Sequence, residues 1–340
     1  MNGTSKCQNN LEQIGLAVHN YHDSMNKLPV FSYAPNGHSE GGDFSPSVLP
    51  PEAGTKKHFS GFILILPFIE QDAYARLYNR SFGYDDDTTP GTPGGPTNRS
   101  LTSKPFPAYL CHSMPTPTAP CYNSYSSYAA SRGNFEYLFN GATIVVNSSG
   151  KPRWTADDGM FISAFNPPPA TNGTASGSLR YIGFAAVSDG LSNTFLVGEK
   201  HYTIEGSTWS SGTNVHSGAM LGGQTFAGNT NYVFPHPGAD ANDGTTNSKM
   251  NSKVVLNTAA SWSAKAGNVT STAADPASLN VNGPDAWFRN TALGAFRSVH
   301  NGGCNFVFGD GSVKFVRDSI DADTYRGLGS RAGGEVLGEY

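Results

Sequence analysis

The chain has 340 residues, enough to bury a sizeable core in one large domain or two modest ones. Only 14% of residues are charged, against roughly 25% in an average soluble domain. The net charge of -4 at pH 7 argues against nucleic acid as a partner. Gly (40) and Pro (22) are frequent beside many uncharged Asn, Ser and Thr residues, a composition typical of a loop-rich, β-leaning protein.

The first predicted element is an amphipathic helix over residues 7–27, where apolar side chains recur at steps of three and four. We expect Asn9 or Asn10 to be the N-cap. We expect Pro29 to end the helix, because the residue before a proline disfavours the α region. One apolar face on such a helix predicts a brace for the globular body that follows. The residues of this face are Leu11, Ile14, Val18, Tyr21 and Met25.

The next part of the chain alternates irregular segments with short elements. Residues 29–61 are expected to be irregular because they carry Gly and Pro pairs. The segment 60–79 begins as a short apolar run and should become helical after Pro67, since proline is favoured in the first turn of a helix. Short strands are expected at 143–146 and 160–163.

Two apolar runs in the middle of the chain, 182–187 and 194–197, flank Asp189 and Gly190. This pattern predicts a strand or short helix, a turn and then a strand, with the Asp189 carboxylate bonded to amides of its own turn. Residues 203–285 follow, rich in Gly, Ser, Thr and Asn. We expect them to be an insertion on which a binding surface is grafted.

The clearest hairpin lies near the C-terminus. Residues 304–308 and 312–316 are predicted strands, joined through Gly309, Asp310 and Gly311. Glycine supplies the positive φ that a tight turn needs, and Asp310 is expected to bond the amides of that turn.

Together these elements predict an α+β fold. The amphipathic helix within residues 1–28 should pack on a large, antiparallel, loop-rich head formed by residues 29–340. Residues 203–285 would be an insertion in that head.

Four cysteines stand at positions 7, 111, 121 and 304, and no C-x-x-C pair occurs, which argues against a zinc ribbon or a thioredoxin-type site. A disulfide between Cys111 and Cys121 would close a Pro-rich loop and leave Cys7 to pair with Cys304. The pairing of Cys7 with Cys111 is the alternative. Disulfides would favour an oxidising location.

Membrane-spanning and export signals bear on location as well. No apolar run reaches the roughly 18 residues needed to cross a bilayer. The chain also starts without a signal peptide, although its composition resembles that of secreted proteins. We therefore expect that a segment preceding Met1 has been removed.

Common catalytic motifs are missing: the sequence has no G-x-S-x-G elbow, H-E-x-x-H helix, Walker phosphate loop or G-x-G-x-x-G fingerprint. His19 and His22 could share a metal, but packing beside the apolar helix face is favoured. His300 and Asp310 could form a dyad, yet an extended strand between them would hold their side chains on the order of 17 Å apart. We expect no direct contact.

Two weaker site candidates remain. A surface calcium ion could bind at the acidic runs 85–87 or 240–244, although neither completes an EF-hand loop. No other cofactor is expected. Trp209, Trp262 and Trp287 could form a sugar-stacking platform, with structural burial as the favoured role.

Four sequence blocks carry a resemblance to a known family. They are CQNNLEQIGLAVHNYHD, LPFIEQDAYARLYN, SDGLSNTFLVGE and FRSVHNGGCNFVFGDGSVKFV, in that order. The chain resembles the bacterial prepilin-type family, domain of unknown function 1559, named for a His, nine intervening residues and Asp-Gly. Here these are His300, Asp310 and Gly311, and we expect the motif to form a structural turn. A second motif turn holds Asp189, Gly190 and Asn193.

The resemblance implies a function. Members of that family usually begin with a basic leader and an apolar helix of type IV pilin character, so the visible helix would be the lower half of a pilin-like spine. The upstream half would anchor the subunit in the inner membrane and later bundle in a filament. This implies a non-enzymatic, pilin- or pseudopilin-like structural subunit that is exported to the cell surface or an extracellular filament. Its partners would be copies of itself or other pilin-like subunits, and its apolar helix face would serve assembly.

The alternative function is an extracellular module that binds glycans or other solutes. It would use the insertion at 203–285 and the indole rings of Trp209 and Trp262. No catalytic residue is carried over from the family, so we expect no enzymatic activity.

Overall fold

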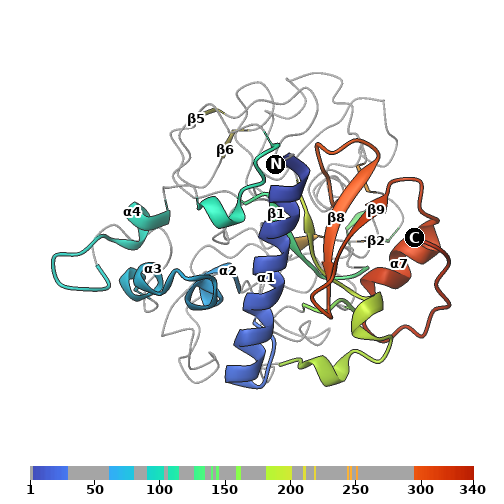
Figure 1. Ribbon diagram of the computed structural model, residues 1–340, viewed down its shortest axis with the longest axis horizontal. Coiled ribbons are helices and arrows are strands. Elements are labelled where there is room, and N and C mark those ends of the chain that lie inside the picture. Colours follow the sequence, from blue (N-terminus) through green and yellow to red (C-terminus); the bar gives the residue numbers. More distant parts are fainter. Residues whose placement is uncertain are drawn as a thin grey trace.

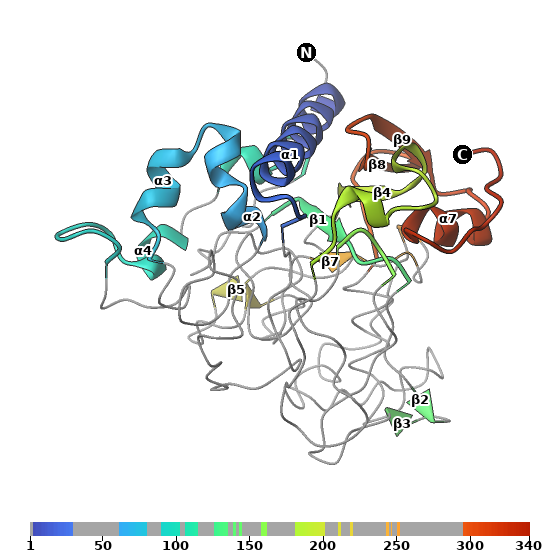
Figure 2. The same cartoon turned by 90° about the horizontal axis from the view of Figure 1, so that it is seen from below.

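A computed structural model shows one long helix lying against a mostly antiparallel sheet (Figures 1 and 2). This confirms the α+β class. The three tryptophans of the platform, Cys121, the acidic run 85–87 and most of 203–285 lie outside the described residues. The structure describes residues 3–29, 61–79, 90–102, 106–114, 126–134, 139–140, 143–144, 158–161, 181–200, 210–211, 218–219, 243–244, 246, 250–251 and 295–340.

Helix α1 spans Gly3–Met25 and packs by one face. Four of the five predicted apolar-face residues are buried, as the spacing indicates; they are Leu11, Ile14, Val18 and Tyr21. Met25 is 45% exposed, so the prediction that it packs with the other four was wrong. It is the last residue of the helix and lies beyond the covered part of the face. The opposite face is open, and Leu16 on it is 55% exposed. The apolar face is therefore covered by the head and is not a free assembly surface.

The ends of α1 differ from the prediction. The helix already includes Gly3, so Asn9 and Asn10 lie inside it and neither is an N-cap. Asn10 instead donates its side-chain amide to the Leu110 carbonyl at 2.8 Å. The helix ends at Met25, before Pro29, because Asn26 takes a left-handed conformation with φ 54°.

The main sheet has the strand order β7-β1-β4-β8-β9. Neighbouring strands are antiparallel except for β7 and β1, which are parallel. The predicted C-terminal hairpin is confirmed as β8 and β9, with Cys304 opposite Val316. The strands are β1 (Tyr128–Ser131), β4 (Phe195–Glu199), β7 (Asp243–Gly244), β8 (Gly303–Phe308) and β9 (Val313–Arg317).

Strand β8 is buried on both faces, and its alternating side chains belong to two cores. Val307 packs in the core beneath α1, whereas Phe306 and Phe308 pack in a second core with Tyr325 of α7 (Ala322–Gly329). Gly15 lets α1 approach closely, since a Cβ there would lie 2.7 Å from Val307 Cγ2. The sheet is thus held between α1 and α7 (Figure 1).

Short helices flank α1 on the side away from β8 and β9 (Figure 2). The expected helix after Pro67 is split by Glu70, whose φ is 62°, into a 3₁₀ turn and a separate α-helix. The elements are α2 (Gly61–Leu64), η3 (Leu66–Ile69), α3 (Asp72–Leu77), α4 (Asn98–Thr102) and η4 (Pro107–Tyr109).

The remaining elements are short. The run at 182–187 forms a 3₁₀ turn, η5 (Phe184–Ala186), and η6 (Leu191–Asn193) follows. The strand expected at 143–146 is seen only as β3 (Thr143–Ile144), paired with β2 (Phe139–Asn140). The prediction of a strand at 160–163 was wrong for its described residues, 160–161. There Phe161 donates one backbone hydrogen bond to the Ser131 carbonyl, where β1 ends. A separate pair is β5 (Ser210–Ser211) with β6 (Gly218–Ala219).

Among the helices in the described ranges, none has the length and apolar character needed to span a bilayer.

Candidate functional site

Three of the four sequence blocks meet at a buried polar cluster beside the first turns of α1. Its centre is Glu199, the last residue of β4, whose side chain is fully buried. The carboxylate accepts hydrogen bonds from the Asn305 backbone N–H at 2.8 Å and from the Asn305 side-chain amide at 3.1 Å. A third bond comes from the Ser298 hydroxyl at 2.8 Å. These donors satisfy the hydrogen-bonding capacity of a carboxylate that water does not reach.

His300 completes the cluster. Its Nε2 lies 3.2 Å from a Glu199 oxygen, and its Nδ1 lies 3.3 Å from the Thr4 hydroxyl on α1. The hydrogen bond to Glu199 raises the pKa of His300, and the charge of Glu199 adds to this, although desolvation opposes it. The His–Glu pair therefore links α1 to the junction of β4 and β8.

This pair predicts a pH dependence of stability for the disulfide-bonded protein. Because the pKa of His300 is raised in the folded state, the pair stabilises fully below the unfolded pKa, about 6.5, and less as the pH rises through the folded pKa. The groups facing the ring are Glu199, Thr4 and the Cys111 sulfur. We expect the difference in urea midpoint between wild type and His300→Gln, measured with chelator present, to be larger at pH 6 than at pH 9. An equal difference at both pH values would contradict the prediction.

A disulfide lies next to this cluster. It joins Cys7 of α1 to Cys111, with 4.7 Å between the two Cα atoms. The preferred pairing of Cys7 with Cys304 was therefore wrong, and the alternative is the one present. The reason is the alternation of β8: Cys304 faces the core on the α7 side, whereas Cys7 lies in the core beneath α1. Cys304 is a free buried thiol, and burial raises its pKa.

His19 and His22 lie near the other end of α1, where they pack as expected. Both rings stack or tilt against Phe184, with centroid distances of 4.5 and 4.4 Å. His19 Nε2 donates to the Gly309 carbonyl at 2.9 Å, and His22 Nε2 accepts from the Phe184 N–H at 3.3 Å. Both rings thus fix α1 on the segments that carry the two Asp-Gly turns.

The family motif spans the whole helix–strand junction. His300 contacts Thr4, whereas Gly309 contacts His19, and these partners are roughly 22 Å apart along α1 at 1.5 Å per residue. His300 is therefore not part of the structural turn to which it was assigned. Direct contact with Asp310 is excluded, as expected.

Asp310 and Gly311 behave as predicted from the turn chemistry. The Asp310 carboxylate accepts from the Ser312 N–H at 2.9 Å and from the Ser312 hydroxyl at 2.6 Å. Gly311 has φ 86°, a value that favours glycine. The turn thereby fixes the end of β8 beneath His19.

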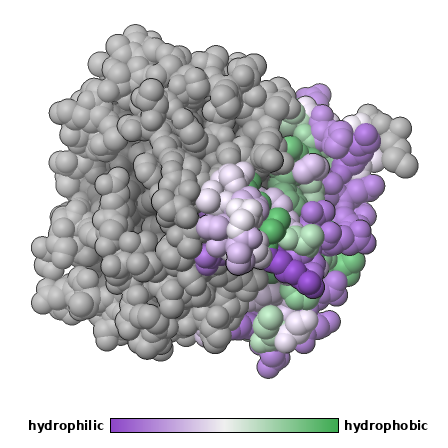
Figure 3. Space-filling model, turned by 90° about the vertical axis from the view of Figure 1, so that its left-hand side faces the viewer, coloured by the Kyte–Doolittle hydropathy of each residue, from purple (hydrophilic) through white to green (hydrophobic). Residues whose placement is uncertain are grey.

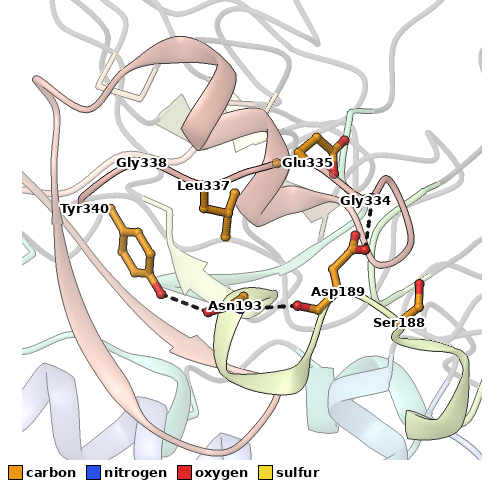
Figure 4. A pocket seen from close by; sticks show the side chains of 9 residues that line it. Ser188, Asp189, Asn193, Gly334, Glu335, Leu337, Gly338 and Tyr340 are labelled. Carbon is orange, nitrogen blue, oxygen red and sulfur yellow. Dashed lines mark hydrogen bonds between the residues drawn. The ribbon is translucent and has the colours of Figure 1, made fainter.

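A pocket of about 520 Å³ lies between the Asp189 turn and the C-terminal segment (Figure 4). The Tyr340 hydroxyl donates to Asn193 Oδ1 at 3.4 Å, and the Asn193 side-chain amide donates to the Asp189 carbonyl at 3.2 Å. Gly190 has φ 92°, consistent with the predicted turn. The lining residues are Ser188, Asp189, Asn193, Gly327, Gly334, Glu335, Leu337, Gly338 and Tyr340.

The role expected for Asp189 was wrong. Its carboxylate bonds the C-terminal segment and not its own turn, since it accepts from the Gly333 N–H at 2.7 Å and the Gly334 N–H at 3.0 Å. The Ser330 hydroxyl donates to it as well, at 3.2 Å. These partners lie more than 140 residues further along the chain, which is why a local pattern did not indicate them.

Removing this carboxylate should detach the C-terminal segment. We expect Asp189→Ala to speed hydrogen exchange at the Gly333 and Gly334 amides by roughly 10- to 100-fold, since hydrogen bonds to charged groups contribute about 1.5–3 kcal/mol. Mass spectrometry of exchanged peptides would measure it. Asp310→Ala is the matched control, because that Asp also precedes a glycine in a turn but bonds Ser312. Unchanged exchange in Asp189→Ala would refute the assignment.

The fold and the site define an α+β protein in which sequence blocks from both ends and the middle of the chain join one helix to one sheet. The chain belongs to the family described as a protein of unknown function, DUF1559, whose model matches residues 4–323. No curated protein and no solved structure matches the chain.

Glu199, the centre of the site, was not among the residues predicted from the sequence. Its position was the available signal. A carboxylate directly after the apolar run of β4 is shielded from water when the paired strand, β8, is also apolar. Such a residue needs buried donors, and here Asn305 and Ser298 supply them.

Proposed function

We propose that this protein is a non-enzymatic, pilin- or pseudopilin-like structural subunit that is exported and assembles with copies of itself or with related subunits. The observation that carries the proposal is the one-sided docking of α1. One face is buried on the antiparallel sheet, while the opposite face, which includes Leu16, is open to solvent. A helix held in this way can serve as a spine for the head and still offer a face to neighbouring subunits.

Helix α1 is bonded to the head near both of its ends. A disulfide, a buried His–Glu pair and the Gln8–Asn305 bond at 3.0 Å hold its first turns. His19 and His22 hold its last turns. A subunit pulled or packed through its helix would keep its head in a fixed orientation.

The surface is consistent with close packing of copies. The net charge is only -4, which limits self-repulsion between subunits. On the side that Figure 3 shows, the described surface is mostly hydrophilic with small hydrophobic patches between polar residues. Assembly would then depend on the helix.

The experiment extends α1 upstream by roughly 20 apolar residues in helical continuity, the length that a membrane helix requires. We expect this protein to insert into lipid vesicles and to form filaments visible by electron microscopy after extraction. The matched control carries a Gly/Ser-rich extension of equal length and should do neither. An apolar extension that leaves the protein soluble and monomeric would refute the proposal.

The pocket beside Asp189 favours a second candidate, the binding of a small solute. Its volume of about 520 Å³ falls in the usual range for small-molecule sites, and the Asn193 carboxamide and the Tyr340 phenol both line it. The insertion named in the sequence-based alternative lies mostly outside the described residues. A glycan array with wild type, Asn193→Ala, Trp209→Ala and Trp262→Ala would test both locations. Absence of binding by wild type would remove this candidate.

A further inference from the structure

Four side chains with metal-binding atoms converge beside the start of α1. They come from four distant parts of the chain: Cys7, Cys111, Glu199 and His300. Their ligand atoms all lie within 4.8 Å of one another, and among the described residues this is the group that gathers such atoms. All four are buried or nearly so, with the His300 side chain 9% exposed.

The separations fit a tetrahedral ion. Zinc bonds of about 2.0–2.3 Å to nitrogen, oxygen and sulfur place neighbouring ligand atoms roughly 3.3–3.8 Å apart. His300 Nε2 lies 3.2 Å from Glu199 Oε1 and 3.8 Å from the Cys111 sulfur. The two sulfurs are bonded to each other, so they must separate for the set to surround an ion.

The surrounding groups orient the ligands. The Thr4 hydroxyl faces His300 Nδ1, which leaves Nε2 directed at the cluster. Asn305 and Ser298 fix the Glu199 carboxylate. Outer partners of this kind hold metal ligands in place and set the imidazole tautomer. Two thiolates, one imidazole and one carboxylate form a ligand set that suits zinc.

We propose that reduction of the Cys7–Cys111 disulfide converts this cluster into a binding site for one Zn²⁺ ion. A dithiol supplies two electrons and two protons, breaks the S–S bond and becomes a disulfide itself. Zinc then displaces the two thiol protons and the proton on His300 Nε2, all of which pass to solvent, and binds both sulfurs, His300 Nε2 and a Glu199 oxygen. Helix α1 and residues 106–114 are thus linked by the disulfide when the two cysteines are oxidised, and by the metal ion when they are reduced. This inference is independent of the proposed structural role.

The test uses the full chain, reduced with dithiothreitol and freed of reductant under anaerobic conditions. We expect native mass spectrometry to show one Zn²⁺ per chain for the reduced protein and none for the oxidised one. Co²⁺ should give the intense visible bands and the thiolate charge-transfer band of a tetrahedral sulfur site. Chelator competition should show at least about tenfold weaker binding for Cys111→Ser and His300→Ala than for wild type.

Controls separate this site from other thiols and from unfolding. Cys304→Ser and Cys121→Ser should bind zinc as wild type does, and Thr4→Val, which keeps all four ligands, should weaken binding by a smaller factor. Near-ultraviolet circular dichroism reports the fold; if reduction alone unfolds the chain, zinc should restore the spectrum. The proposal fails if reduced wild type binds no zinc, if Cys111→Ser binds it equally well, or if zinc does not restore an unfolded reduced chain.

Discussion

Replacing Leu11 with alanine is expected to lower the free energy of unfolding by about 2–5 kcal/mol. Leu11 is fully buried in the core between α1 and the sheet, where Ile14, Val197 and Val307 also lie. Truncation removes apolar area and leaves a cavity that the rigid sheet cannot fill. Urea denaturation followed by circular dichroism would measure the loss.

Leu16→Ala is the matched control for this prediction. It makes the same chemical change in the same helix, but Leu16 is 55% exposed on the opposite face. Its effect on unfolding should stay within about 0.5 kcal/mol. Equal losses in the two variants would mean that α1 does not dock by the face described here.

Replacing Glu199 with alanine is the second change expected to have a large effect. It leaves the buried Asn305 amide without its acceptor and His300 without its counter-ion. Removing one partner of a buried, hydrogen-bonded pair costs about 3–5 kcal/mol, so unfolding should become easier by that amount. The first turns of α1 should also exchange their amides faster, because Thr4 contacts the same histidine.

Glu12→Ala provides the comparison, since Glu12 is an exposed carboxylate on α1. We expect it to change stability by no more than about 0.5 kcal/mol. A Glu199→Ala protein as stable as Glu12→Ala would show that the buried cluster does not hold the helix.

Local patterns predicted the elements of this fold well. The spacing of Leu11, Ile14, Val18 and Tyr21 fixed the buried face of α1, and the Gly-Asp-Gly turn fixed the C-terminal hairpin. Both depend on neighbouring residues alone, through helical periodicity and turn geometry. Met25 and the helix ends were missed because the surrounding head and a left-handed Asn26 decide them.

The site was less predictable because its contacts are long-range. Asp189 binds Gly333 and Gly334, and Cys7 binds Cys111, each across more than 100 residues. Pairing of Cys7 with Cys304 required both side chains to lie on the same side of the sheet. Cys7 of α1 lies in the core beneath that helix, whereas the alternation of β8 turns Cys304 toward the core on the α7 side. No local pattern carries this information.

The spacing of the family motif now has a physical explanation. His300 precedes β8 and Asp310 follows it, and β8 runs beneath α1. The nine residues between them therefore set how strand and helix align. Insertion or deletion of one residue in β8 would also exchange the two cores, since Val307 and Phe306 face opposite sides.

Hydroxyl-radical footprinting with mass spectrometry, applied to the N-terminally extended protein before and after assembly, tests the one-sided docking of α1 most directly. We predict that Leu16 and Met25 are oxidised in the unassembled protein, that Leu11 and Val18 are protected, and that Leu16 becomes protected in filaments. Oxidation of Leu11 as fast as Leu16, or labelling of Leu16 that assembly does not change, would contradict it.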